Sequence, residues 1–303
     1  MSVRSIEGSG VGETYEELRP LMFSIAYRMV GSVTDAEDIV QEAMLRFHRE
    51  SLEGTVIESP KAYLSAITTR LSIDHLRSAR VRRESYVGPW LPEPLVTDES
   101  DDVALHAETA DSLSLAFLVL LESLSPVERA VFLLREVFEY DYDEISSIVG
   151  KSEDNCRQLA VRARRQLEEK KPRFEASRRR RDELAARFFA AASQGDTEGL
   201  IGLLAADVVA YADGGGKATA FPRPVFGRDR VARLLSGSRE RAERLRVTSF
   251  RLAEVNGQPG ALFFDPEGGV VLVISVDIAD DQVQTVRAVS NPEKLRHLRP
   301  ATI

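Results

Sequence analysis

Apolar residues recur at intervals of three and four over residues 13–86, which predicts amphipathic helices and few strands. Thr34 is followed three positions later by a glutamate, a capping pattern that predicts a helix start near Asp35. Ser59 and Pro60 predict a second start, because serine is a common N-cap and proline fits the first helical position. We therefore expect a compact helical bundle here.

The helical spacing ends in a stretch that is rich in proline and acid. Pro89, Pro92 and Pro94 each lack a backbone donor, and several carboxylates follow them. We predict a linker over residues 87–103 and a second helical domain over residues 104–172.

The pattern changes again in the C-terminal part of the chain. One amphipathic helix follows the four arginines at 178–181, and strand-like runs separated by Gly, Pro, Asn and Asp come next. These runs are Val208–Tyr211, Val247–Leu252, Ala261–Phe264, Val270–Asp277 and Gln282–Val289. A helix over 228–235 interrupts them. Strands with a few helices predict a separate α+β domain over residues 182–303.

Composition narrows the class of protein. A chain of 303 residues exceeds what one hydrophobic core usually supports, which favours several domains. The single cysteine, Cys156, excludes an internal disulfide framework, and with four scattered histidines we expect neither a metal site nor a cofactor. The most apolar stretches are too short to cross a bilayer, and the first residues lack the apolar core of a signal peptide. We expect a cytoplasmic protein without a membrane contact.

The net charge of −8 argues against indiscriminate binding to nucleic acid, but the basic residues gather in two islands. The first island contains Arg70, Arg77, Arg80, Arg82 and Arg83. The second contains Arg157, Arg162, Arg164, Arg165, Lys170, Lys171, Arg173 and 178–181. Such islands in an acidic chain indicate local contacts with a polyanion.

Residues 124–170 have the layout of a helix-turn-helix. A capped helix starts at Ser125-Pro126, a short helix follows, and Gly150 begins the turn before a third helix. The inward positions of that helix are Leu159, Ala160 or Val161, Ala163 and Leu167. Arginine and glutamine near the start of such a helix can contact base edges in the major groove. The alternative is an ordinary helical hairpin with a solvated basic face.

Two strings in the N-terminal bundle carry a family resemblance. Residues 35–43 read DAEDIVQEA, and residues 73–80 read IDHLRSAR. The bundle resembles region two of the bacterial extracytoplasmic-function sigma factors, and residues 124–170 resemble region four of the same family. The alternative for the acidic residues of the first string is a solvated helix face.

The resemblance implies core RNA polymerase and promoter DNA as partners, with contacts to the beta-prime clamp helices and the beta flap. Residues implied for polymerase binding are Asp35, Asp38, Gln41, Glu42 and Arg46. Those implied for the minus-ten element are Lys61, Arg70, Arg77, Arg80, Arg82 and Arg83, with Tyr63 or Tyr86 as candidates for stacking on unstacked bases. Those implied for the minus-thirty-five element are Arg157, Gln158, Arg162, Arg164 and Arg165.

Three short C-terminal and linker strings resemble the signatures of a sigma subfamily with a fused SnoaL-like domain, a cone-shaped α+β fold around a pocket. The strings are Trp90-Leu91-Pro92-Glu93-Pro94, Asp213-Gly214-Gly215-Gly216-Lys217 and Asn291-Pro292-Glu293-Lys294-Leu295. The subfamily usually has aspartate where this chain has Glu293. We expect these strings to regulate the sigma regions by docking, with Trp90 dominating the contact and Glu93 meeting Lys217.

The sequence thus predicts a multidomain protein with two all-α sigma domains followed by an α+β SnoaL-like domain, acting as an alternative sigma factor without covalent chemistry. One rival is a helix-turn-helix regulator that works without polymerase. Another is a DNA-binding module fused to an enzyme, with Asp213, Asp265 and Asp277 as candidate bases. The pocket of the C-terminal domain leaves room for an unidentified small ligand.

Overall fold

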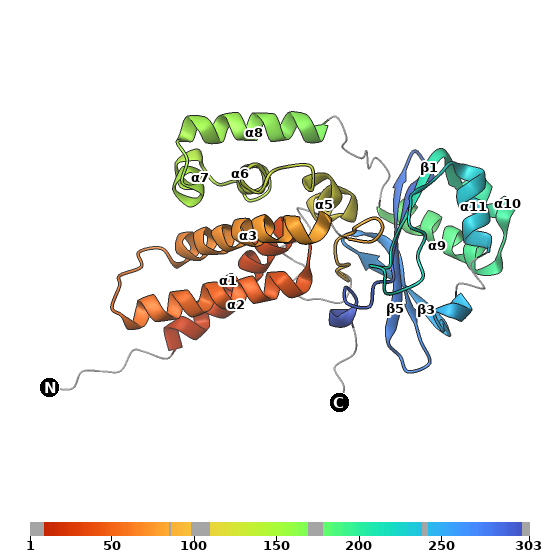
Figure 1. Ribbon diagram of the computed structural model, residues 1–303, viewed down its shortest axis with the longest axis horizontal. Helices are drawn as coiled ribbons and strands as arrows, with labels where there is room; N and C mark the ends of the chain where they lie inside the picture. Colours follow the sequence, from red (N-terminus) through yellow and green to blue (C-terminus); the bar gives the residue numbers. More distant parts are fainter. Residues whose placement is uncertain (1–8, 85, 98–109, 169–177, 238–241, 299–303) are drawn as a thin grey trace. The chain divides into compact units, whose positions relative to one another are not determined.

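The computed structural model describes residues 9–84, 86–97, 110–168, 178–237 and 242–298, and the chain divides into two compact units (Figure 1). Unit 1 contains residues 1–82, 104–112 and 120–171. Unit 2 contains residues 83–103, 113–119 and 172–303. The proline-rich stretch that the sequence predicts as a linker therefore belongs to the same unit as the C-terminal domain.

Unit 1 begins with three long helices, α1 (Ser9–Val30), α2 (Val33–Leu52) and α3 (Pro60–Glu84). The start of α3 agrees with its prediction, since the Ser59 hydroxyl accepts a hydrogen bond from the Ala62 amide at 3.3 Å. The predicted cap of α2 is wrong: Ser32 rather than Thr34 is the N-cap, and its hydroxyl accepts from the Asp35 amide at 3.1 Å. Both residues are common caps, and the turn after α1 selects the earlier one.

The second part of unit 1 contains α6 (Pro126–Glu136), α7 (Tyr142–Val149) and α8 (Glu153–Glu168). A capping box starts α6, in which the Ser125 amide donates to the Glu128 carboxylate at 3.1 Å. Two further short helices, α4 (Ala110–Leu113) and α5 (Leu115–Leu121), precede α6 in the chain, and residues 113–119 of this stretch belong to unit 2.

Buried polar contacts join the two parts of unit 1. The Arg129 guanidinium donates to the Met29 carbonyl at 2.6 Å, and the Tyr140 hydroxyl contacts the Ser65 hydroxyl at 2.7 Å. Burial lowers the pKa of Arg129 to about 10. These contacts satisfy polar groups that would otherwise be desolvated without a partner.

Unit 2 is built on a six-stranded sheet in the order β2-β1-β6-β5-β4-β3. The strands are β1 (Leu204–Asp213), β2 (Val225–Phe226), β3 (Ser249–Val255), β4 (Gln258–Phe264), β5 (Val270–Ala279) and β6 (Gln282–Val289). Neighbouring strands pair antiparallel except β1 and β6, which run parallel. Parallel pairing brings the carboxyl ends of β1 and β6 to the same edge of the sheet.

The sheet buries a different apolar cluster on each face. The helices α9 (Arg178–Gln194), α10 (Thr197–Leu203) and α11 (Arg228–Ser236) cover one face (Figure 1), where Phe188 and Val231 pack with strand residues such as Val208. On the other face, Leu91 from the proline-rich stretch packs with Val289. A short 3-10 helix, Arg296–Leu298, follows the last strand.

The five predicted strands all exist, and β6 has the predicted bounds. The sequence pattern does not predict β2, which has only two residues, or α10, which is too short to show a helical period. Within the described part of the chain, every helix is too short or too polar to cross a membrane.

Candidate functional sites

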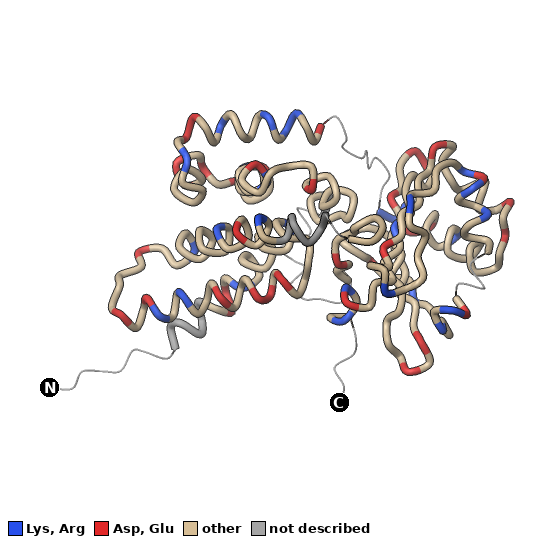
Figure 2. The backbone as a smooth tube through the Cα atoms, in the orientation of Figure 1, with Lys and Arg blue, Asp and Glu red and all other residues tan. Residues whose placement is uncertain are grey.

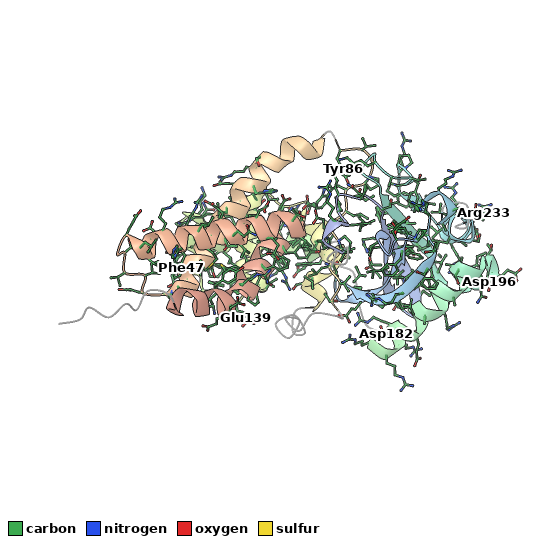
Figure 3. All side chains as sticks on the ribbon, turned by 90° about the horizontal axis from the view of Figure 1, so that it is seen from below. Phe47, Tyr86, Glu139, Asp182, Asp196 and Arg233 are labelled. Atoms are coloured by element: carbon green, nitrogen blue, oxygen red, sulfur yellow. The ribbon has the colours of Figure 1, made fainter. Side chains whose placement is uncertain are left out.

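The exposed face of α2 carries the residues predicted to bind polymerase. Its core side packs in the helical bundle through residues such as Ile39, Ala43 and Phe47 (the last labelled in Figure 3). The side chains on the opposite face are solvent-exposed, except that Asp35 is half-buried: Asp35, Asp38, Gln41, Glu42, Leu45 and Arg46. Leu45 is 59% exposed in the middle of this polar face. We call this set the α2 face.

Internal ion pairs organise the α2 face. Arg46 pairs with Glu42 at 2.7 Å, one helical turn away. Asp35 lies 3.4 Å from His75 of α3, measured from Oδ2 to Nε2. Acidic positions dominate the first part of the helix, and the arginines follow toward its C-terminal end (Figure 2).

On α3, the predicted DNA-binding residues have different surroundings. Lys61 is exposed, and Arg77 pairs with Asp74 at 3.1 Å. Arg70 donates to the carbonyls of Ser147 and Ile148 at 2.8 and 2.9 Å. These carbonyls lie at the C-terminal end of α7, where a cation is favoured.

The side chains of Arg80, Arg82 and Arg83 lie outside the described residues. Tyr63 is half-buried, with its ring centroid 5.9 Å from that of Phe47, and burial raises the pKa of its hydroxyl. Of the two tyrosines considered for base stacking, Tyr86 is engaged in unit 2, as described below.

The helices α7 and α8 form the predicted helix-turn-helix. Gly150 ends α7 in the left-handed conformation, with φ of 66°, which turns the chain sharply into α8. Cys156, Leu159 and Ala160 are buried against α6 and α7. Ala160 rather than Val161 is the inward position, since Val161 is 63% exposed. Burial is the main cause that raises the pKa of the Cys156 thiol.

All five residues predicted to read DNA are exposed on α8, and basic positions continue along the helix (Figure 2). Arg157 pairs with Glu153 at 2.7 Å and Asp154 at 3.1 Å, and Arg164 pairs with Glu136 at 2.5 Å. Arg162 lies 3.9 Å from Glu128. Within the described ranges no carboxylate lies within ion-pair distance of Arg165. We call Arg157, Gln158, Val161, Arg162, Arg164 and Arg165 the α8 face.

A buried carboxylate, Asp213, connects the proline-rich stretch to the end of the sheet in unit 2. Its two oxygens accept hydrogen bonds from the Tyr86 hydroxyl at 2.5 Å, the Leu91 amide at 2.8 Å and the Gly215 amide at 3.0 Å. They also pair with the Lys294 ammonium at 2.8 Å. Asp213 has no exposed surface. A buried carboxylate is stable only with such hydrogen-bond donors and a cationic partner, and Asp213 has both.

Lys294 and Asn291 complete this arrangement from beyond the end of β6. The Lys294 ammonium also donates to the Leu91 carbonyl and lies 4.2 Å from the centroid of the Trp90 ring, a cation-π geometry. The Asn291 amide donates to the Tyr86 hydroxyl at 2.9 Å. Burial and the bond to Asp213 raise the pKa of Tyr86, so the phenol stays protonated and donates. We call Tyr86, Trp90, Leu91, Asp213, Asn291 and Lys294 the docking cluster (Tyr86 is labelled in Figure 3).

The stretch continues along the free edge of the sheet. Residues 95–97 pair with the end of β3: the Thr97 amide donates to the Glu254 carbonyl at 2.9 Å, and Val96 bridges Val255. Asn256 is fully buried, and its side chain accepts from the Leu95 amide at 2.9 Å and donates to the Leu113 carbonyl at 3.0 Å. The stretch thus extends the sheet by a short strand-like segment.

One predicted contact of the docking strings is wrong. Lys217 pairs with Glu293 rather than Glu93, and both partners of that pair are about half exposed. Glu93 is buried and lies 3.9 Å from Nδ1 of His297. The loop that carries Lys217 folds toward Asn291, which separates it from Glu93.

The other predicted docking residues come together as follows. Pro92 and Pro94 are buried with Leu91, Leu295 packs in the same apolar cluster, and Pro292 is exposed. Gly215 and Gly216 have positive φ values of 58° and 71°, whereas Gly214 does not. A Cβ on Gly215 would lie 2.2 Å from the Asn291 amide nitrogen, so glycine is required for this close approach.

Two residues of this site are not among the docking residues predicted from the sequence. Tyr86 is predicted only as a candidate for base stacking, and Asn256 is not predicted at all. The Asn256-Gly257 pair between two strand-like runs is a hairpin signal. That signal locates the turn but not the burial of the amide.

The three aspartates considered as catalytic bases have structural partners. Asp213 pairs with Lys294, and the buried Asp277 pairs with Arg287. Asp265 accepts from the Gly269 amide at 2.7 Å in the turn before β5.

Comparison with known proteins identifies the class of protein. Residues 14–82 match the family Sigma-70 region 2, and residues 114–167 match Sigma-70, region 4. The ECF RNA polymerase sigma factor SigJ of Mycobacterium tuberculosis is 36% identical over 289 residues, which cover 92% of this chain and 91% of SigJ. A probable ECF RNA polymerase sigma factor, SigI of the same species, is 30% identical over 291 residues, which cover 95% of this chain and 96% of SigI.

The crystal structure of SigJ superimposes with a TM-score of 0.74 and 34% identity, and covers 94% of this chain and 98% of SigJ. This chain therefore belongs to the extracytoplasmic-function RNA polymerase sigma factors. The predicted fold class, helical sigma regions followed by a SnoaL-like sheet domain, is confirmed. The chain is an alternative sigma factor that binds RNA polymerase and promoter DNA.

We expect substitution of Lys294 to destabilise unit 2 much more than substitution of Lys217. Lys294→Met removes the charged partner of a buried carboxylate, which typically costs about 3–5 kcal/mol. Lys217→Met removes an exposed ion pair worth about 0–1 kcal/mol. We expect Lys294→Met to speed proteolytic cleavage within residues 86–97 of the full chain and to lower the urea midpoint of unit 2, with Lys217→Met as the matched control. Equal effects of both substitutions would contradict the conclusion that the buried Asp213–Lys294 pair holds residues 86–97 in unit 2.

Proposed function

We propose that this alternative sigma factor contacts core polymerase through the α2 face, the minus-ten element through α3 and the minus-thirty-five element through the α8 face. We further propose that the C-terminal sheet domain regulates these activities by holding residues 86–97 within unit 2. The observation that carries the assignment of surfaces is the exposure of the predicted side chains on α2 and α8. The apolar sides of both helices pack in the core.

The α2 face suits a protein partner more than a nucleic acid. It presents carboxylates together with an exposed leucine, and carboxylates repel DNA phosphates. Complementary charge supports a basic partner surface, and Leu45 supplies apolar contact area at its centre. The clamp helices of the beta-prime subunit are the proposed partner, and the beta flap is the proposed partner of the region-four helices.

The α3 residues support a single-strand contact. Lys61 is exposed, and the pair that Arg77 makes with Asp74, one turn away, is also exposed, so both cations can reach phosphates at low cost. Arg70 must first leave the α7 carbonyls. The proposal therefore assigns Arg70 to DNA only in a state where α3 and α7 have separated.

The α8 face has the side chains for major-groove reading. Gln158 and Arg162 can form bidentate contacts to base edges, and the exposed Val161 can contact a thymine methyl group. Arg165, which has no carboxylate partner among the described residues, is the arginine that binds a phosphate with the least competition.

Regulation by unit 2 is supported by the place of residues 86–97 in the chain. They lie between sigma region 2 and sigma region 4, and the docking cluster holds them in unit 2. Binding or release of this segment changes the length of free chain between the two regions. That length limits how the two promoter elements can be contacted together.

The rivals make different predictions. A regulator that acts without polymerase would bind DNA alone, and an enzyme would require acid–base groups that the three paired aspartates do not supply. We propose no covalent chemistry. Since polymerase transcribes in the cytoplasm, we also propose that the chain acts there.

Run-off transcription with core polymerase is the direct test. Initiation that depends on the chain supports the proposal. A lack of initiation together with unstable association with polymerase would favour the regulator that acts without polymerase.

Reversing charge on the α2 face is expected to weaken polymerase binding. In Asp38→Lys/Glu42→Lys, like charges meet at the interface, which costs several kcal/mol. We expect Kd for core polymerase to rise at least about 100-fold, since each 1.4 kcal/mol is tenfold. The control Asp182→Lys/Glu198→Lys reverses two exposed carboxylates of unit 2. Unchanged affinity of the α2 variant in an interferometry titration would refute the assignment.

Removing Arg165 is expected to weaken promoter binding by the polymerase complex. If Arg165 neutralises one phosphate, Arg165→Ala should reduce the slope of log affinity against log salt by about 0.9. The matched control is Arg187→Ala, which removes an exposed arginine of α9. If affinity and salt slope match the wild type in gel-shift titrations, α8 does not bind DNA through this residue.

Disturbing the docking cluster is expected to change transcription. Gly215→Ala places a Cβ against Asn291. Gly268 also has a positive φ, 81°, but a Cβ added there would have no heavy atom within 4 Å, so Gly268→Ala is the control. We expect Gly215→Ala, and likewise Trp90→Ala, to change promoter-dependent transcription about fivefold or more, the lower range of allosteric coupling. Both should also expose residues 86–97 to protease, and Gly268→Ala should not. Wild-type readouts for both cluster variants would exclude regulation by docking.

A further inference from the structure

Unit 2 contains a cavity on the face of the sheet that carries α9 and α11. Its volume is about 560 Å³, within the range of roughly 300–1,000 Å³ typical of small-molecule sites. Close-packed protein interiors contain few voids larger than a water molecule. A space of this size therefore needs an explanation in the residues that surround it.

Small side chains on two neighbouring strands, β1 and β6, create the space. Ala212 of β1 is paired with Ala288 of β6, which is paired with Ile274 of β5, and all three line the cavity. Larger residues at the two alanine positions would fill the floor. On the opposite side Ala192 of α9 also lines the cavity, next to the aromatic rings of that helix.

The chemistry of the lining is apolar and uncharged. Phe188, Phe189, Phe221, Phe250 and Phe263 supply aromatic walls. The polar residue types in the lining are serine, threonine, Tyr211 and Gln194. The described lining residues include no Asp, Glu, Lys, Arg or His. A charged ligand would lose its hydration here without a counter-ion, which is strongly unfavourable.

We propose that this cavity binds an uncharged, mainly apolar organic molecule with an aromatic or ring-shaped body and one or two hydrogen-bonding groups. The hydroxyls at Thr219, Thr248 and Ser290 orient the polar groups of the ligand, and the phenylalanine rings enclose its body. The inference concerns binding alone and stands independently of the proposed sigma surfaces. Asp213, Asp265 and Asp277 are absent from the described lining, so binding rather than acid–base turnover is the activity that this cavity supports.

The cavity lies next to the docking cluster in the chain. Ala212 and Ser290 line the cavity, and the residues that follow them, Asp213 and Asn291, belong to the cluster. Thr219 and Phe221 follow the glycine-rich loop closely. An occupant therefore contacts the strand ends that carry the cluster.

A pair of fluorescent probes tests the class of ligand on the full chain. N-phenyl-1-naphthylamine is uncharged, and 8-anilino-1-naphthalenesulfonate has the same ring skeleton with an added sulfonate. We expect one site for the neutral probe, with a Kd at least about tenfold lower than that of the sulfonate, equivalent to 1.4 kcal/mol. Equal affinity for both probes would overturn the assignment of an uncharged ligand.

Filling the cavity tests its location. Ala288→Phe fills it from the sheet and Ala192→Phe from α9, so one variant remains informative if the other fails to fold by circular dichroism. Ala190→Phe adds the same ring to an exposed position of α9 and is the matched control. We expect each filled variant to weaken neutral-probe binding at least about tenfold and the control to bind as the wild type does. Wild-type binding by a folded cavity variant would place the probe elsewhere and overturn the proposal.

Discussion

The arrangement of unit 2 depends on one buried charge, the carboxylate of Asp213. A desolvated carboxylate is stable only when its hydrogen-bonding capacity is filled, and here the donors come from separate segments of the chain: Tyr86 and Leu91, the loop after β1, and Lys294 beyond β6. The parallel pairing of β1 and β6 makes this possible, because it brings both carboxyl ends to one edge of the sheet. The stretch between the sigma regions thus completes an electrostatic site of the C-terminal domain, and Trp90 covers the ammonium of Lys294 rather than acting as an isolated apolar anchor.

Much of the fold follows from local sequence. The capping box at Ser125 and the serine-proline pair at residue 60 start their helices as predicted, and period-two runs locate five of the six strands. The helix-turn-helix was predictable because Gly150 combines a required left-handed conformation with clear apolar periodicity on both sides. The resemblance of the short strings led to the family, which the relatives confirm. The roles of individual α2, α3 and α8 residues stay predictions.

What the sequence could not supply is long-range pairing. Lys217 and Lys294 are both lysines in short signature strings, but only one is buried against Asp213, and the choice depends on the path of the glycine-rich loop. The wrong pairing of Glu93 with Lys217 arose from charge alone. Asn256 shows the same limit, since its amide binds Leu95 and Leu113, which lie far away in the chain. The choice between Ser32 and Thr34 as a cap depends on how α1 ends, which local pattern does not specify.

The separation of the cluster along the chain has a consequence for synthesis. Lys294 and Leu91 are 203 positions apart, so a ribosome adding about 5–20 residues per second makes the proline-rich segment roughly 10–40 s before the residue that binds its carbonyl. In the later part of that interval, once residue 167 has been added, both sigma regions are complete in sequence, while the segment between them still lacks Asn291 and Lys294 as partners. Every newly made molecule therefore passes through an undocked form, and a chain that ends prematurely before Asn291 remains in it.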